Sequence, residues 1–136
     1  MITAADTSVL LDVFLRDDRH GHTSRQWLRE AYDAGALIIC DVVYAELAPA
    51  FPDRHALDQT LREVNVVVSA VDSHMAYDAG QRWGRYRQAG GTRARIISDF
   101  LIGAHAVEAA ERFLTRERGF YSSYFPELDR REIQPP

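Results

Sequence analysis

The chain has 136 residues, of which 46% are hydrophobic, and this is enough for one domain with an ordinary core. The net charge of -4 argues against a uniformly basic nucleic-acid binder, and because all 16 basic residues are arginine, mechanisms that need a lysine nucleophile, a Schiff base or a phosphate-binding lysine are excluded. One cysteine cannot form an intramolecular disulfide or a thiolate zinc cage, and without a membrane-length apolar run or a signal peptide we expect one cytoplasmic domain over residues 1–136.

Short apolar runs alternate with amphipathic segments through the first half of the chain. Residues 2–5 form the first predicted strand, Asp6 follows it, and the next helix is capped by Thr7 or Ser8. After a charged loop at 16–22, the pattern predicts a helix from Thr23 to Ala34, with Gln26 completing a capping box. The next predicted elements are a strand at 36–40, a helix capped by Asp41, a helix at 53–63 and a strand at 64–68.

The second half continues the alternation and contains a helix that begins with an acid. A long helix starts at Asp72 or Ser73 and stops at glycines 90 and 91. Ser98 and Asp99 are both good N-cap residues before an apolar helix, and Asp99 taken alone would be interpreted only as a cap. The remaining predictions are a strand at 112–115, a turn at 116–120 that holds Glu117, and a short fifth strand at 130–134.

Strands that alternate with helices predict an α/β protein with a three-layer α/β/α fold and a central parallel sheet of four to five strands. In such sheets the functional crevice lies at the carboxyl ends of the strands, where Asp6, Asp99 and Glu117 fall. Glu46 joins them because it lies in a short apolar helix just after a buried strand, although a helical glutamate is normally a solvated surface residue. Four converging carboxylates need a compensating cation unless some are protonated, and oxygen ligands favour Mg²⁺ or Mn²⁺.

Five arginines lie within and after the long helix, with no acid between them. Trp83 and Tyr86 are interleaved with them, and the group forms a local positive surface despite the acidic total. Such a surface suits phosphate contacts, but it is also what a solvated helix face looks like. The five residues are Arg82, Arg85, Arg87, Arg93 and Arg95.

Four segments carry the acids in a characteristic order. They are Asp6-Thr7-Ser8 after the first strand, VYAEL at 43–47, SDFLIGA at 98–104 and LTRERGF at 114–120. Their order and spacing in a chain of this length resemble a PIN domain, and more narrowly the VapC-type toxins of bacterial toxin–antitoxin pairs. The resemblance runs from the first strand to the two final prolines.

The resemblance implies a metal-dependent endoribonuclease, the toxin of a type II toxin–antitoxin module. It implies a homodimer that is neutralised by a cognate antitoxin, and an RNA substrate. If the chain is such a nuclease, we expect the five arginines to hold the RNA backbone. The hydroxyl of Thr7 or Ser8 matches a family position that supports the site. The acids that match the family's metal-binding and catalytic positions, for one or two Mg²⁺ or Mn²⁺ ions, are Asp6, Glu46, Asp99 and Glu117.

One residue departs from the family pattern, since the fourth acid is usually aspartate and Glu117 is one methylene longer. This departure supports an alternative, a catalytically weak PIN-fold module that binds RNA or a protein. A phospho-acceptor receiver domain is excluded because its chemistry needs a lysine near the site. The five histidines match no nucleophile pattern, and His20 and His22 lack further ligands at a metal-site spacing, so both are interpreted as solvated.

Overall fold

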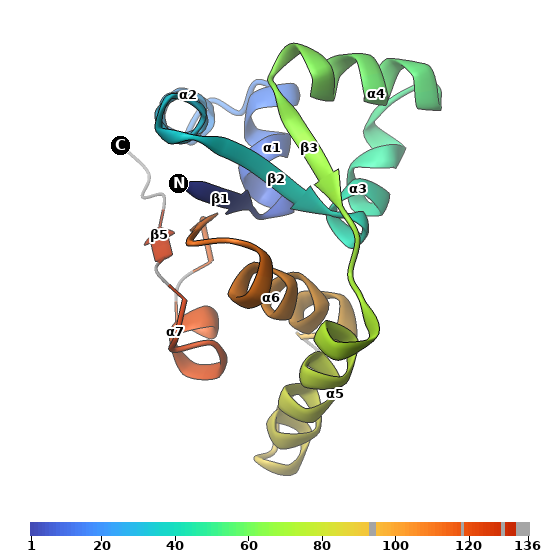
Figure 1. Ribbon diagram of the computed structural model, residues 1–136, viewed down its shortest axis with the longest axis vertical. Coiled ribbons are helices and arrows are strands. Elements are labelled where there is room, and N and C mark those ends of the chain that lie inside the picture. The colour runs from blue at the N-terminus through green and yellow to red at the C-terminus, as the bar shows by residue number, and fades with distance from the viewer. Residues whose placement is uncertain (93–94, 118, 129, 133–136) are drawn as a thin grey trace.

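A computed structural model of the chain describes residues 1–92, 95–117, 119–128 and 130–132. Its centre is a parallel sheet of five strands in the order β3-β2-β1-β4-β5 (Figure 1). The strands are β1 (Ile2–Ala5), β2 (Ala36–Cys40), β3 (Val66–Ser69), β4 (Arg112–Thr115) and β5 (Arg130–Glu132). The predicted parallel sheet is therefore confirmed.

Helices cover both faces of this sheet. Figure 1 shows α1 to α4 around the upper part of the sheet and α5, α6 and α7 below it, which agrees with the predicted three layers. Their bounds are α1 (Thr7–Phe14), α2 (Gly21–Ala34), α3 (Asp41–Leu47) with a 3-10 turn (Ala48–Ala50), α4 (Arg54–Glu63), α5 (Ser73–Gln88), α6 (Ile97–Ala109) and α7 (Phe120–Tyr124). Within the described residues, none of these helices has the length and apolar character needed to cross a bilayer.

Aromatic packing fixes helix α6, which carries Asp99. The ring of Phe100 is fully buried and meets the ring of Phe120 edge to face at 5.2 Å between centroids. Gly103 allows Phe125 to approach the same helix, because a Cβ atom at Gly103 would lie 2.5 Å from the Phe125 ring. The position of Asp99 is thus set by tight packing around Phe100 and Gly103, which follow it in the same helix.

Several helices begin at residues other than the predicted caps, and the first two show why. Asp6, and not Thr7 or Ser8, caps α1: its Oδ1 accepts a hydrogen bond from the Thr7 amide at 2.8 Å. Helix α2 begins at Gly21 without a side-chain cap, so the capping box predicted at Thr23 is wrong. The early start of α2 follows from backbone hydrogen bonds that already form in the preceding loop. A capping hydrogen bond joins residues close in sequence, but which residue forms it depends on the direction from which the chain enters the helix.

Two further differences concern short elements. Strand β3 begins at Val66, two residues later than predicted, because Asn65 has a left-handed backbone (φ 59°) that ends α4 and redirects the chain. Helix α7 was not predicted, because five residues are too few to show a helical period; it is stabilised by burial of Phe120 and Tyr121. Residues 133 and 134 of the predicted fifth strand lie outside the described residues.

Candidate metal centre

The order of the strands creates a topological switch point between β1 and β4. The chain moves outward from β1 through β2 to β3, and then returns to form β4 and β5 on the other side of β1. Ligands of such sheets bind outside the carboxyl ends of the strands at this point. Asp6 directly follows β1 and Glu117 lies two residues beyond β4, so both acids flank the expected crevice.

A cleft of about 260 Å³ lies at this position. Larger hollows of 540 and 560 Å³ occur elsewhere, but each is lined by no more than one acid, so the chemistry of the lining distinguishes the smaller cleft. All four predicted acids and both predicted hydroxyl residues contribute to it. The lining consists of Asp6, Thr7, Ser8, Leu11, Glu46, Asp99, Arg116 and Glu117.

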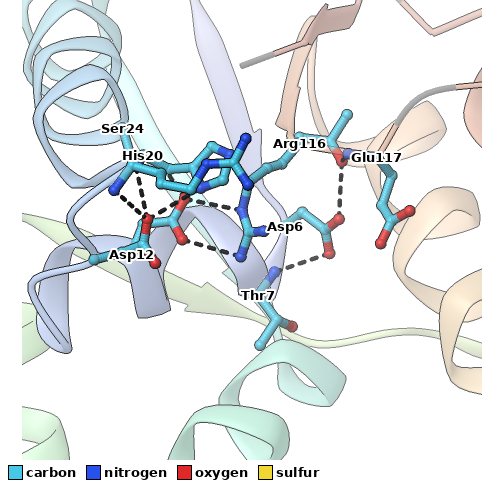
Figure 2. A network of polar contacts seen from close by, with 10 residues as sticks. Asp6, Thr7, Asp12, His20, Ser24, Arg116 and Glu117 are labelled. Atoms are coloured by element: carbon cyan, nitrogen blue, oxygen red, sulfur yellow. Dashed lines mark hydrogen bonds and ion pairs between the residues drawn. The ribbon is translucent and has the colours of Figure 1, made fainter. Parts of the chain in front are cut away.

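Asp6 is the most deeply buried of the four acids, at 7% exposure. Its Oδ1 accepts from the amide of Thr7, and its Oδ2 accepts from the hydroxyl of Thr115 at 2.9 Å (Figure 2). Burial raises the pKa of Asp6 to about 6, and the negative charges of Glu117 and Glu46 add to this rise, while the two hydrogen bonds oppose it. A cation in the cleft would offset the same unfavourable charge.

Hydroxyl groups surround the acids. Thr7 Oγ1 donates to Glu46 Oε1 at 2.6 Å and so ties α1 to the exposed glutamate of α3. The buried hydroxyls of Ser8 and Ser98 have no hydrogen-bond partner among the described residues. Of these two residues only Ser8 lines the cleft, so its hydroxyl is available to a water or an ion bound there.

Asp99 lies in the first turn of α6, which begins at Ile97, so it is not the N-cap that the sequence predicted. Its Oδ2 accepts from the amide of Ile96 at 3.0 Å. This bond holds the carboxylate at the positive end of the helix and leaves Oδ1 for another ligand.

Glu117 is held by an arginine. Arg95 Nη2 donates to Glu117 Oε2 at 2.7 Å, and the same guanidinium lies over the ring of Phe120 at 4.4 Å from its centroid. The backbone of Glu117 is also fixed, because its amide donates to Thr115 Oγ1. In this arrangement the side chain of Glu117, which is one methylene longer than aspartate, forms an ion pair with the guanidinium of Arg95.

The ligands of this cleft fit a hard divalent cation. The four acids and two hydroxyls offer oxygen only, which Mg²⁺ and Mn²⁺ prefer over softer metals. The acids are nevertheless more widely spaced than in a closed cage: among the described residues, the only three acids or histidines whose ligand atoms all lie within 4.8 Å are Asp12, Asp17 and His20. An open arrangement suits Mg²⁺, which usually keeps several of its waters.

That tighter group is a network of polar contacts next to the cleft, and it was not predicted from the sequence. Asp12 of α1 is 2% exposed, accepts from Ser24 Oγ at 2.8 Å and pairs with Arg116. Asp17 accepts from the ring and the amide of His20. Figure 2 shows Asp12 and Ser24 beside the Arg116 side chain. Both carboxylates therefore already have partners within the chain. The available signal was an acid inside the otherwise apolar run at 9–15.

The five predicted RNA-binding arginines have different environments. Arg82 is buried and forms two 2.7 Å hydrogen bonds to the carboxylate of Glu127, so its charge is used inside the protein. Arg85 and Arg87 are exposed on α5. Arg95 is paired with Glu117, and Arg93 lies outside the described residues.

We expect Arg82→Gln to lower the free energy of unfolding by about 2 kcal/mol, because hydrogen bonds to charged groups are worth roughly 1.5–3 kcal/mol and Arg82 also packs over Phe125. Arg85→Gln, on the exposed face of the same helix, should change it by less than about 0.5 kcal/mol. Urea denaturation of both variants measures the difference. Equal stability of the two would mean that Arg82 is not a structural residue.

The chain belongs to the PIN domain family, whose profile matches residues 4–126. This match covers the whole cleft and confirms the predicted fold. A search of curated protein sequences found no match.

Several solved structures share the fold at low sequence identity. VapBC2 from Rickettsia felis, bound to a DNA fragment from its promoter, is 16% identical, with a TM-score of 0.74 over 98% of this chain and 100% of that one. DNA-bound VapBC from Salmonella typhimurium is 16% identical, with a TM-score of 0.69 over 97% and 98%. A toxin–antitoxin complex from Klebsiella pneumoniae is 20% identical, with a TM-score of 0.55 over 93% and 94%. At these identities the likeness establishes the fold alone.

Proposed function

We propose that this protein is a metal-dependent endoribonuclease that acts in the cytoplasm as the toxin of a VapBC-type module and is neutralised by a cognate antitoxin. The observation that carries the proposal is the convergence of four carboxylates in one cleft at the switch point of a PIN domain. The likeness to a solved toxin–antitoxin complex supports the antitoxin partner. By family analogy we also propose a homodimer.

In this proposal Asp6 and Asp99 hold a Mg²⁺ or Mn²⁺ ion, and Glu46 and Glu117 complete its surroundings. The bound ion supplies the Lewis acidity and the positive charge that phosphodiester hydrolysis needs. The chain orients the ligands: Thr7 fixes the Glu46 carboxylate, and the Ile96 amide fixes Asp99. These two hydrogen bonds restrict the rotation of the Glu46 and Asp99 side chains and so fix the positions of their carboxylate oxygens.

The RNA backbone is proposed to contact the exposed arginines Arg85 and Arg87 and the partly exposed Arg95, and Arg93, outside the described residues, stays in the proposed set. Arg87 already lies over the ring of Trp83 at 4.9 Å, which places a cation and an aromatic face together. Such pairs suit single-stranded RNA, whose bases stack on aromatic rings. Arg82 is left out of this set because its guanidinium is buried in the ion pair with Glu127.

The test is cleavage of a single-stranded reporter RNA by antitoxin-free protein with Mg²⁺, with Mn²⁺ and with EDTA. We expect cutting with either metal, none in EDTA, and none for Asp99→Asn, because a neutral amide is a poor ligand for a hard cation. Asp33→Asn, at an exposed acid of α2, is the matched control and should cut normally. Calorimetry with Mn²⁺ provides a second readout, in which only Asp99→Asn should lose affinity.

The Arg95–Glu117 ion pair favours the alternative of a weak nuclease or a binding module, because it occupies the fourth acid. A binding module would keep its affinity for RNA in EDTA and leave the reporter intact when metal is added. If wild-type protein behaves in this way, Glu117→Asp is the next variant. Recovered cleavage would identify a weakened nuclease, whereas continued binding without cleavage would contradict the nuclease proposal.

A further inference from the structure

Arg116 contributes the positive charge within the cleft lining. Of the eight residues that line the cleft, it alone carries a cationic side chain, and Figure 2 shows this side chain reaching towards Asp12. Its side chain is 35% exposed, so it is neither fully buried nor free in solvent. From the sequence, Arg116 is predicted only as part of the turn at 116–120.

A buried carboxylate holds this arginine. Arg116 Nε donates to Asp12 Oδ2 at 3.1 Å, and Nη2 lies 3.0 Å from Asp12 Oδ1. Ser24 Oγ donates to the same Asp12 Oδ2. Because Asp12 is 2% exposed, an unpaired charge there would be strongly unfavourable, and the pairing with Arg116 is correspondingly persistent.

The geometry of the pair leaves part of the guanidinium for another anion. A planar guanidinium has five N–H donors, and Asp12 engages the edge formed by Nε and Nη2. The edge that carries Nη1 is a second bidentate donor site of the kind that binds phosphate oxygens. Residues from α1, α2 and the end of β4 thus fix a cation beside the acids before any ligand enters.

We propose that Arg116 binds a non-bridging oxygen of the RNA phosphate at the cleavage site, and that Asp12 and Ser24 are positioning residues for it. This inference rests on the proposed nuclease function. A phosphodiester entering a cleft with four carboxylates is repelled unless cations face it, and a single divalent ion balances only part of that charge. Arg116 supplies further positive charge in a fixed orientation, which a flexible surface arginine cannot.

The competing explanation is that Arg116 serves only as the counter-ion of Asp12. That explanation predicts effects on stability alone. A phosphate contact additionally affects the salt dependence of RNA binding, because each neutralised phosphate of a single strand contributes about 0.7 to the slope of log K against log salt. It also affects kcat, because the contact orients the reacting phosphate.

Binding is measured by fluorescence anisotropy with a fluorescein-labelled single-stranded RNA of about 12 nucleotides, in Ca²⁺, with the probe checked for integrity on a gel. Arg116→Gln should lower the salt slope by about 0.7, and Arg116→Lys should keep the slope because the charge remains.

In cleavage assays with Mg²⁺, both variants should lose at least about tenfold in kcat, since lysine lacks the bidentate edge. Asp12→Asn should keep the slope and lower kcat.

Arg54→Gln is the matched control, because Arg54 is also paired with an aspartate but is 86% exposed on α4. It should change neither the slope nor kcat. The double variant Arg116→Gln with Asp12→Asn removes the unpaired buried charge, so it separates loss of folding from loss of phosphate binding.

The inference is overturned if Arg116→Gln, or the double variant where the single one does not fold, keeps both the wild-type slope and the wild-type kcat. Failure of the nuclease proposal gives a different result: wild-type protein would not cut with either metal, while the salt slope would still report whether Arg116 contacts phosphate.

Discussion

Asp6→Asn is expected to stabilise the metal-free protein and to abolish its binding of divalent ions. The pKa of Asp6 is raised from 3.8 to about 6, chiefly by burial, so the folded protein binds the proton more tightly than the unfolded chain. Stability from this group is present below pH 4 and is lost as pH rises through about 6. Wild-type protein at pH 8 therefore carries a cost of about 3 kcal/mol that a neutral asparagine avoids.

Urea denaturation in EDTA at pH 8 and at pH 4.5 measures this effect. The stability advantage of Asp6→Asn over wild type should be about 2 kcal/mol larger at pH 8 than at pH 4.5. Asp33→Asn, at an exposed acid, should show no such change between the two pH values. The substitution also alters the hydrogen bond to Thr115, which shifts stability by the same amount at both pH values. Taking the difference between the two pH values removes this constant effect.

Addition of Mn²⁺ completes the experiment. Wild-type protein should gain stability as the ion binds the folded state, while Asp6→Asn should gain none. A pH-independent difference between the two proteins would contradict the raised pKa, and equal stabilisation by Mn²⁺ would remove Asp6 from the metal centre. We therefore expect Asp6 to lower the stability of the metal-free protein and to be required for its stabilisation by Mn²⁺.

Phe100→Ala should lower the free energy of unfolding by about 4 kcal/mol, the largest stability effect that we expect in this chain. The Phe100 side chain is fully buried, and its ring contacts four other aromatic rings at centroid distances of 5.2 to 6.1 Å. Truncation leaves a cavity that cannot close, because the neighbouring rings also pack against one another.

Chemical denaturation at constant pH gives the measurement, with Tyr77→Ala as the control. Tyr77 is an aromatic residue of α5 that is 71% exposed, and its loss should change stability by less than about 1 kcal/mol. Since Phe100 adjoins Asp99, weaker Mn²⁺ binding by Phe100→Ala is also expected. If Phe100→Ala and Tyr77→Ala were equally stable, the aromatic cluster would not hold α6 in place.

Local sequence signals predicted most of the elements correctly. Asp53 and Asp72 were predicted to start helices, and both cap them by accepting backbone amides three residues ahead. The strands at 2–5, 36–40 and 112–115 have the predicted bounds. These predictions succeed because caps and strand patterns depend on atoms only a few residues apart.

The places where prediction failed involve choices between similar local options. Three adjacent residues, Asp6, Thr7 and Ser8, are all able to cap α1, and the structure uses Asp6. Ser98 and Asp99 were predicted caps for α6, but the helix starts at Ile97. The local free-energy differences among such options are small, so packing of the helix against the sheet decides between them.

The sequence by itself determined the order of strands and helices, the parallel sheet and the positions of the four acids along the chain. Only the tertiary structure decided which charges meet. Asp12 and Arg116 pair across 104 residues, and Arg82 pairs with Glu127 across 45, so one predicted RNA-binding arginine became internal while an unnoticed one entered the cleft. The physical reason is that periodicity records which face of an element is buried, whereas an ion pair depends on which elements the fold brings together.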